Sequence, residues 1–150
     1  MGTTVSLNQL EGRRVVAADD ANQIGQVKHL VLSPDARHVE AVHVAGKKHK
    51  ADIVGWEDIA SIGSDAVMVT SGSAARQPKS DTDSEFVRGD VTIIGARVLD
   101  TDGYEIGTVI DLDFDGDSGE IVSVTTSNGP ITASRIRSLG TFALVVDTEL

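Results

Sequence analysis

The feature that most limits how this chain can fold is a hairpin pattern that its sequence contains twice. The first copy runs from Gly12 to Val27 and the second from Gly95 to Val109. In each copy, two runs rich in β-branched residues flank a polar turn, and a glycine follows soon after the turn, as in a tight β-hairpin. A period of about 80 residues is too long for a solenoid, so the pattern indicates a tandem duplication of one small domain.

Both copies continue with the same order of expected elements. Strands are expected over residues 39–44 and 121–124, and a Val-rich strand closes each copy. Between them, Trp56–Gly63 and Ser134–Gly140 are each expected to form one or two helical turns that end at a glycine. A sheet this small must close on itself to bury its apolar face and hide its edges. We therefore expect an all-β protein of two small β-barrels in tandem, each with a short helical turn before its last strand.

These patterns divide the chain into four segments. Residues 1–9 form an N-terminal tail that we expect to fray, residues 10–70 the first barrel, and residues 89–150 the second barrel. Residues 71–88 are small and polar without periodicity, which predicts a flexible linker. Because a domain of about 60–70 residues is marginally stable alone, we expect the barrels to dock on each other or the protein to form a homodimer.

Composition restricts the function and the partners. The net charge is −10, and residues 76–150 hold 6 Lys or Arg against 14 Asp or Glu, which argues against a nucleic-acid partner and favours a basic one. The absence of cysteine excludes disulfides and thiolate metal sites. No apolar run approaches the roughly 18 residues of a membrane span, and the N-terminus lacks a signal-peptide pattern, so we expect a cytoplasmic protein without a membrane partner.

A set of short motifs recurs in the same order in both copies. The motifs are Gly12 with Val15, Ile24–Val27 and Ile59–Gly63 in the first copy, and Gly95 with Val98, Ile106–Val109 and Ile136–Gly140 in the second. Taken in order, they resemble the PRC-barrel family. The resemblance implies a six-stranded, barrel-like docking domain without shared catalytic residues, as in the photosynthetic reaction-centre H subunit and the C-terminal domain of a ribosome-maturation factor. It therefore implies a non-catalytic protein-interaction or adaptor module with no cofactor; the alternative is a ribosome- or RNA-associated maturation factor.

The stretch from Asp111 to Glu120 is the strongest candidate for a metal site. Carboxylates at alternate positions before a glycine resemble the start of a calcium loop, but the twelfth position of an EF-hand would need Glu and holds Val122. Alternation with apolar residues instead predicts a strand with one buried and one acidic, solvated face, which is the interpretation we favour. A weak divalent-cation-dependent binder is the remaining alternative, with the candidate ligands Asp111, Asp113, Asp115 and Asp117.

Three residues of the first copy are candidate interface residues. Trp56 is the only tryptophan and suits an interface anchor. Val31 and His29 align with Asp113 and Asp111 on the expected outer face, where an apolar residue hints at a contact. The basic tip Lys47–Lys50 is expected to be a solvated hairpin end. All four histidines are expected to be surface residues rather than metal ligands: His29, His38, His43 and His49.

Overall fold

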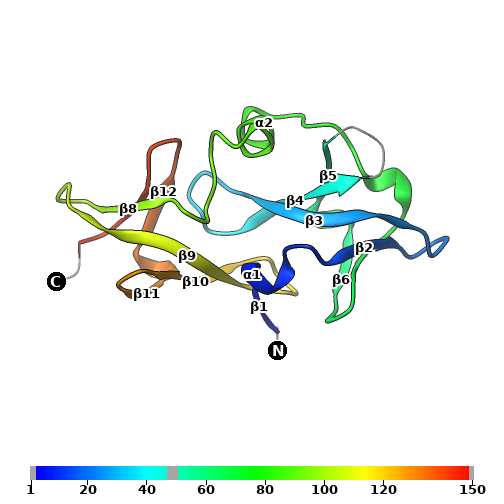
Figure 1. Ribbon diagram of the computed structural model, residues 1–150, viewed down its shortest axis with the longest axis horizontal. Coiled ribbons are helices and arrows are strands. Elements are labelled where there is room, and N and C mark those ends of the chain that lie inside the picture. Colours follow the sequence, from blue (N-terminus) through cyan, green and yellow to red (C-terminus); the bar gives the residue numbers. More distant parts are fainter. Residues whose placement is uncertain (1–2, 47–50, 149–150) are drawn as a thin grey trace.

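Two sheets of the same design make up most of the computed structural model, which describes residues 3–46 and 51–148. They lie side by side along the long axis of the molecule (Figure 1). The first is six-stranded, in the order β5-β4-β3-β2-β7-β6. The second is seven-stranded, in the order β11-β10-β9-β8-β13-β12, with β1 paired to β9. Apart from β1, every described strand of one sheet has a counterpart at the same place in the other.

The two halves also share the direction of their strands. Described neighbours are antiparallel except for one parallel pair in each sheet, β2 with β7 and β8 with β13. This agreement confirms the predicted duplication and the all-β fold. The first sheet contains β2 (Arg14–Ala17), β3 (Gln23–Leu32), β4 (Val39–Gly46), β5 (Ala51–Gly55), β6 (Ile59–Ile62) and β7 (Val67–Val69). The second contains β8 (Arg97–Asp100), β9 (Glu105–Asp115), β10 (Ile121–Thr126), β11 (Gly129–Thr132), β12 (Ile136–Leu139) and β13 (Leu144–Val146).

The packing of two strands explains why a glycine follows the first predicted turn. Gly25 lies on β3 opposite the end of β4, where a Cβ atom would overlap the carbonyl oxygen of Ala45 and a methyl group of Val44. A larger residue would force the two strands apart. In the first copy, the glycine of the Ile-Gly-x-Val pattern therefore marks a close approach of two strands.

The expected helical turns are only partly present. Trp56–Asp58 and Ala133–Arg135 form the 3₁₀ turns η1 and η3. The rest of each expected segment is strand, β6 after η1 and β12 after η3, so the helical prediction for Trp56–Gly63 and Ser134–Gly140 was wrong beyond the first turn. β-Branched residues such as Ile59 favour a pleated surface, and pairing with the neighbouring strand satisfies the backbone that a short helix would leave open.

Residues 3–10 are ordered, whereas a fraying tail was expected over residues 1–9. β1 (Thr4–Ser6) pairs antiparallel with β9 of the second sheet, and α1 (Leu7–Leu10) packs on the same strand. The physical reason is that three apolar side chains of this short segment are buried. They are Val5, Leu7 and Leu10.

The segment over residues 71–88 is also structured, rather than the flexible linker expected from its composition. It contains the 3₁₀ turn η2 (Gly72–Ala74) and the helix α2 (Asp81–Arg88). Between them, Arg76 forms an antiparallel bridge with Ile53 on the outer edge of β5. The helix packs on β3, so this segment covers the first sheet instead of swinging between two domains.

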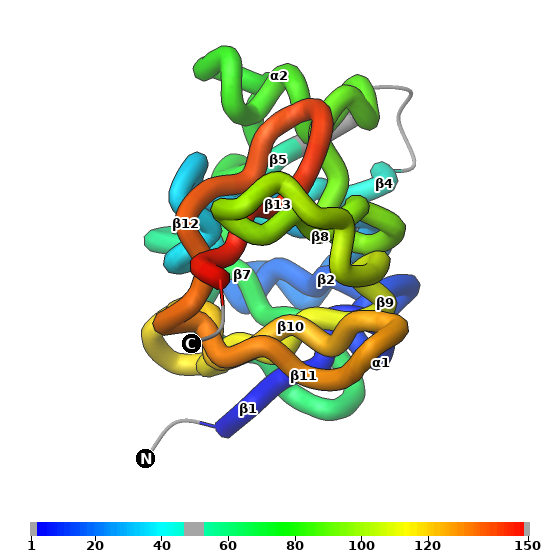
Figure 2. Tube along the Cα trace, turned by 90° about the vertical axis from the view of Figure 1, so that its left-hand side faces the viewer, coloured from blue at the N-terminus to red at the C-terminus, as the bar shows by residue number. Residues whose placement is uncertain are grey.

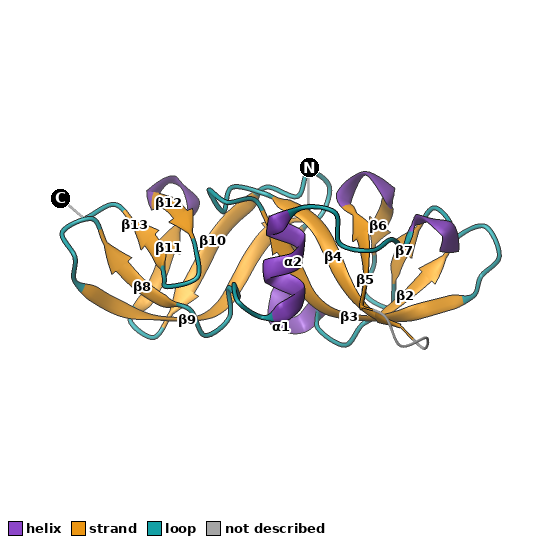
Figure 3. Cartoon of the chain, turned by 90° about the horizontal axis from the view of Figure 1, so that it is seen from above, coloured by secondary structure: helices purple, strands orange, loops and turns teal. Residues whose placement is uncertain are grey.

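The two sheets share one core. Buried apolar residues of both halves, of α2 and of the N-terminal segment belong to a single cluster. Seen from above, α1 and α2 both lie at the junction of the sheets (Figure 3). A view along the long axis shows α2 and β1 on opposite sides of the molecule (Figure 2). Among the described residues, none of the helices has the length and apolarity needed to cross a membrane.

Candidate functional site

The barrels meet where the tip of the β3–β4 hairpin crosses the tip of the β9–β10 hairpin. His38 and Glu120 form an antiparallel bridge there. The amide of Val39 donates to the carbonyl of Gly119, and the amide of Ile121 donates to the carbonyl of Arg37, each over 2.8 Å. His38 and Glu120 are equivalent positions of the two copies, as are the donors and the acceptors. The junction therefore has a local two-fold symmetry.

Side chains at the junction break this symmetry by size. Trp56 stacks edge to face on Phe114 of the second barrel, with 6.2 Å between ring centroids, and also covers the backbone of Gly119. At the equivalent contact, the guanidinium of Arg37 donates to the carbonyl of Ala133 over 2.9 Å. A large residue thus meets a small one at both places, but the large residue faces Gly119 in one and Ala133 in the other. Both large residues, Trp56 and Arg37, belong to the first barrel.

The N-terminal segment reinforces the junction through hydrogen bonds to β9 of the second barrel. The hydroxyl of Ser6 donates to the carboxylate of Asp111 over 2.6 Å, and the backbone amide of Asn8 donates to the same carboxylate over 3.0 Å. The side-chain amide of Asn8 donates to the carbonyl of Ile110 over 2.8 Å. Residues that precede the first barrel are therefore bonded to the second.

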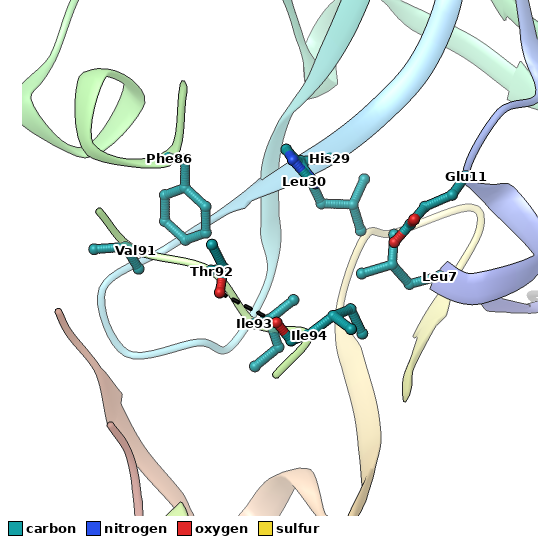
Figure 4. A pocket seen from close by; sticks show the side chains of 9 residues that line it. All are labelled: Leu7, Glu11, His29, Leu30, Phe86, Val91, Thr92, Ile93 and Ile94. Carbon is teal, nitrogen blue, oxygen red and sulfur yellow. Dashed lines mark hydrogen bonds between the residues drawn. The ribbon is translucent and has the colours of Figure 1, made fainter. Parts of the chain in front are cut away.

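A mostly apolar cavity of about 200 Å³ lies between the barrels; we call it the junction cavity. Its walls come from the N-terminal segment around α1, from β3 of the first barrel, from α2, and from the segment that enters the second barrel. Figure 4 shows these side chains around the open space. Two groups without a hydrogen bond among the described residues, the Glu11 carboxylate and the His29 ring, lie on its wall. The lining residues are Leu7, Glu11, His29, Leu30, Phe86, Val91, Thr92, Ile93 and Ile94.

A buried histidine lies behind His29. His43 is directly opposite His29 across β3 and β4, with 5.9 Å between ring centroids, and is only 2% exposed. Its Nδ1 has no hydrogen-bond partner among the described residues. Burial, with smaller contributions from the nearby His29 and Lys28, lowers the pKa of His43 from 6.5 to about 4. The prediction that His43 is a surface residue was therefore wrong.

Comparison with known proteins identifies the fold family. A family model, the PRC-barrel domain, matches residues 2–76 and 87–140, which is most of the chain. The chain belongs to the PRC-barrel family. A comparison with curated proteins finds no match. The first match includes the N-terminal segment and ends at Arg76, and the second begins inside α2, so the two PRC-barrels together account for nearly all of the junction.

The three candidate interface residues have different places in this PRC-barrel protein. Trp56 lies at the junction and contacts the second barrel. His29 lies on the wall of the junction cavity. Val31 is completely buried on β3, so the expectation that it lies on the outer face was wrong. The predicted basic tip, Lys47–Lys50, lies outside the described residues.

The four candidate metal ligands follow β9 into its turn. Asp111 binds the N-terminal segment, and Asp113 pairs with Ser6 in the sheet. Hydrogen bonds from the amides of Ser118 and Asp117 lower the pKa of Asp115, whose carboxylate closes the β9–β10 turn; Asp117 itself is exposed. Within residues 3–46 and 51–148, no group of three or more His, Asp or Glu is placed to hold a metal ion.

Sequence reasoning missed several residues of the junction. Arg37 and Gly119 occupy equivalent positions in the two copies, and a comparison of side-chain size there would have indicated an asymmetric contact. The spacing of Leu7 and Leu10 was a sign of a buried face that the polar composition of the segment concealed. Nothing in the sequence indicated the cavity, because its walls come from segments far apart in the chain.

Proposed function

We propose that this protein is a non-catalytic interaction module in which two PRC-barrels act as one body. The observation that supports this proposal is the junction, where the hairpin tips exchange equivalent backbone hydrogen bonds and the N-terminal segment binds the second barrel. These contacts fix the position of the surface of one barrel relative to that of the other. A partner that contacts both would not have to order them on binding, which favours affinity.

The chemistry of the second barrel favours a basic protein partner. Its β8–β9 turn presents Tyr104, which is 69% exposed. Tyr104 lies between the exposed carboxylates of Asp102 in the turn and of Glu105 at the start of β9, and the Glu105 carboxylate also lies 3.7 Å from the Arg97 guanidinium. Exposed tyrosine is a frequent interface anchor, and nearby carboxylates attract basic residues of a partner. The equivalent turn of the first barrel, around Asp19 and Asp20, is acidic without an aromatic residue. We propose that residues 101–105 are a contact site for the partner.

Affinity capture from native lysate tests this function. The full chain should retain a defined protein in a salt-sensitive way, and Tyr104→Ala should reduce the affinity by roughly tenfold or more, as for an interface anchor. Asp20→Asn, in the equivalent turn of the first barrel, is the matched control and should leave capture unchanged. Capture that is abolished by nuclease would favour the RNA-associated alternative, and capture that is abolished by a chelator would favour the cation-dependent one. Equal capture by wild type and Tyr104→Ala would reject the proposed contact site.

A further inference from the structure

We infer that the junction cavity is a binding site for a small apolar amine, an aromatic or branched aliphatic group that carries one ammonium. The inference is independent of the protein partner proposed above. It rests on three properties of the cavity, namely its size, the chemistry of its walls and its place between the two copies.

The size and the walls suit an apolar group of one ring. The cavity measures about 200 Å³, and Phe86, Val91 and Ile93 on its walls are nearly completely buried. For comparison, an apolar cavity of roughly 150 Å³ lined by Leu, Ile and Phe stays dry and binds benzene. Water gains few hydrogen bonds in such a space, so an apolar ligand that replaces it is favoured.

The polar groups on the wall select the charge of the ligand. The carboxylate of Glu11 faces the open space beside Leu7 (Figure 4) and forms no ion pair with any described residue. The hydroxyl of Thr92 is engaged with the carbonyl of Ile94 over 3.2 Å. An ammonium group would pair with the carboxylate of Glu11. An anionic group would be repelled.

The two copies contribute different side chains to the cavity at one pair of equivalent positions. Two backbone hydrogen bonds fix the same geometry in both halves: Arg13 to Leu10 over 3.0 Å, and Ala96 to Ile93 over 3.1 Å. Glu11 and Ile94 follow Leu10 and Ile93 and are therefore equivalent residues, and both line the cavity. One copy thus supplies a charge where the other supplies an apolar wall, which gives the cavity a polar and an apolar side.

Calorimetry with a matched pair of probes tests the inference on the full chain. We expect 2-phenylethylamine to bind with a saturable 1:1 stoichiometry at neutral pH and to raise the melting temperature. The anionic 3-phenylpropionate, of similar size and shape, should bind at least tenfold more weakly. Glu11→Gln should weaken binding of the amine five- to tenfold, whereas Asp19→Asn, which removes an acidic group elsewhere in the first barrel, should leave it unchanged.

A second variant tests the location. Thr92→Phe places a ring in the mouth of the cavity and should abolish binding of the amine. If this variant does not fold, Glu11→Gln still decides the matter, because Glu11 is exposed to solvent and its loss leaves the core intact. The inference is overturned if wild type shows no saturable binding of 2-phenylethylamine, if both probes bind equally, if Glu11→Gln and Asp19→Asn behave alike, or if folded Thr92→Phe binds as wild type does.

Discussion

Gly119 occupies a position where both the backbone and the neighbouring ring exclude a side chain. Its φ is +78°, in the left-handed region, and a Cβ atom would lie 2.9 Å from the Trp56 ring. We expect Gly119→Ala to lower the free energy of unfolding by about 2–3 kcal/mol, of which about 1–2 is the left-handed conformation and the rest is displacement of Trp56. Urea unfolding followed by Trp56 fluorescence would measure this change.

Gly103→Ala is the matched control for that substitution. Gly103 also has a left-handed φ, +89°, but no atom lies within 4 Å of the position its Cβ would take. Only the conformational cost of about 1–2 kcal/mol is therefore expected, with the emission of Trp56 unchanged. Equal losses of unfolding free energy in the two variants would contradict the conclusion that the Trp56 ring packs directly on Gly119.

His43 should make the stability of the protein depend on pH. The unfolded chain takes up a proton at this residue below pH 6.5, whereas the folded protein resists protonation until about pH 4. Stability is therefore complete above pH 6.5 and is lost as the pH falls through this window, by roughly 3 kcal/mol at most. In His43→Phe this loss should be absent, so the stability of the variant relative to wild type should rise between pH 7 and pH 4. Urea titrations at several pH values measure it; a constant difference would refute the assignment.

At the scale of single elements, α2 depends on a buried carboxylate in its first turn. Burial raises the pKa of Asp83, but hydrogen bonds from the Lys79 amide and the Arg76 guanidinium outweigh this and leave the pKa below its usual value. Asp83→Ala removes the carboxylate oxygen that accepts both hydrogen bonds and leaves Arg76 without its ion-pair partner, so we expect a loss of about 2–3 kcal/mol in the free energy of unfolding. Asp81→Ala, an exposed change in the same turn, should cost less than about 1 kcal/mol.

Hydrogen exchange would show this effect locally. In wild type, the amides of α2 should be protected as well as those of β3, on which the helix packs. In Asp83→Ala, protection should fall first within residues 80–91. If the amides of α2 in wild type exchanged as fast as those of an unstructured segment, the segment would be the flexible linker that its composition predicts.

The strands were predictable from the sequence and α2 was not, for a physical reason. Alternating β-branched residues such as those around Val15 and Val98 predict a strand with one buried face, and the same pattern occurs in both copies. In α2, by contrast, only Phe86 and Val87 are large apolar residues, and the helix is stabilised by its contacts with β3 and by Asp83. The local signals of a helix were its two ends: the Ser80 hydroxyl accepts a hydrogen bond from the amide of Asp83, and Gly89 follows the last turn in a left-handed conformation.

The whole molecule adds features that neither copy contains. β1 precedes the first barrel but pairs with the second, and Arg37 reaches across to Ala133. The junction cavity exists only where segments of both copies meet. Such contacts join residues about 100 positions apart, as between Ser6 and Asp111, and no local pattern in the sequence records them. The fold could therefore be predicted from the repeat, whereas the candidate site required the arrangement of the two copies.

A shared core implies that the two barrels unfold together. Ile136 is completely buried in β12 of the second barrel, and Ile136→Ala should lower the free energy of unfolding by about 2–5 kcal/mol. Because both barrels belong to one cluster of buried residues, the same loss should appear at amides of β4 in the first barrel, as measured by hydrogen exchange in dilute urea. Ile110→Ala, at a half-exposed position of the second barrel, should have an effect of less than about 1 kcal/mol. If Ile136→Ala destabilised the second barrel and left β4 protected as in wild type, the barrels would be independent domains, and the fixed surface on which the proposed interaction module depends would not exist.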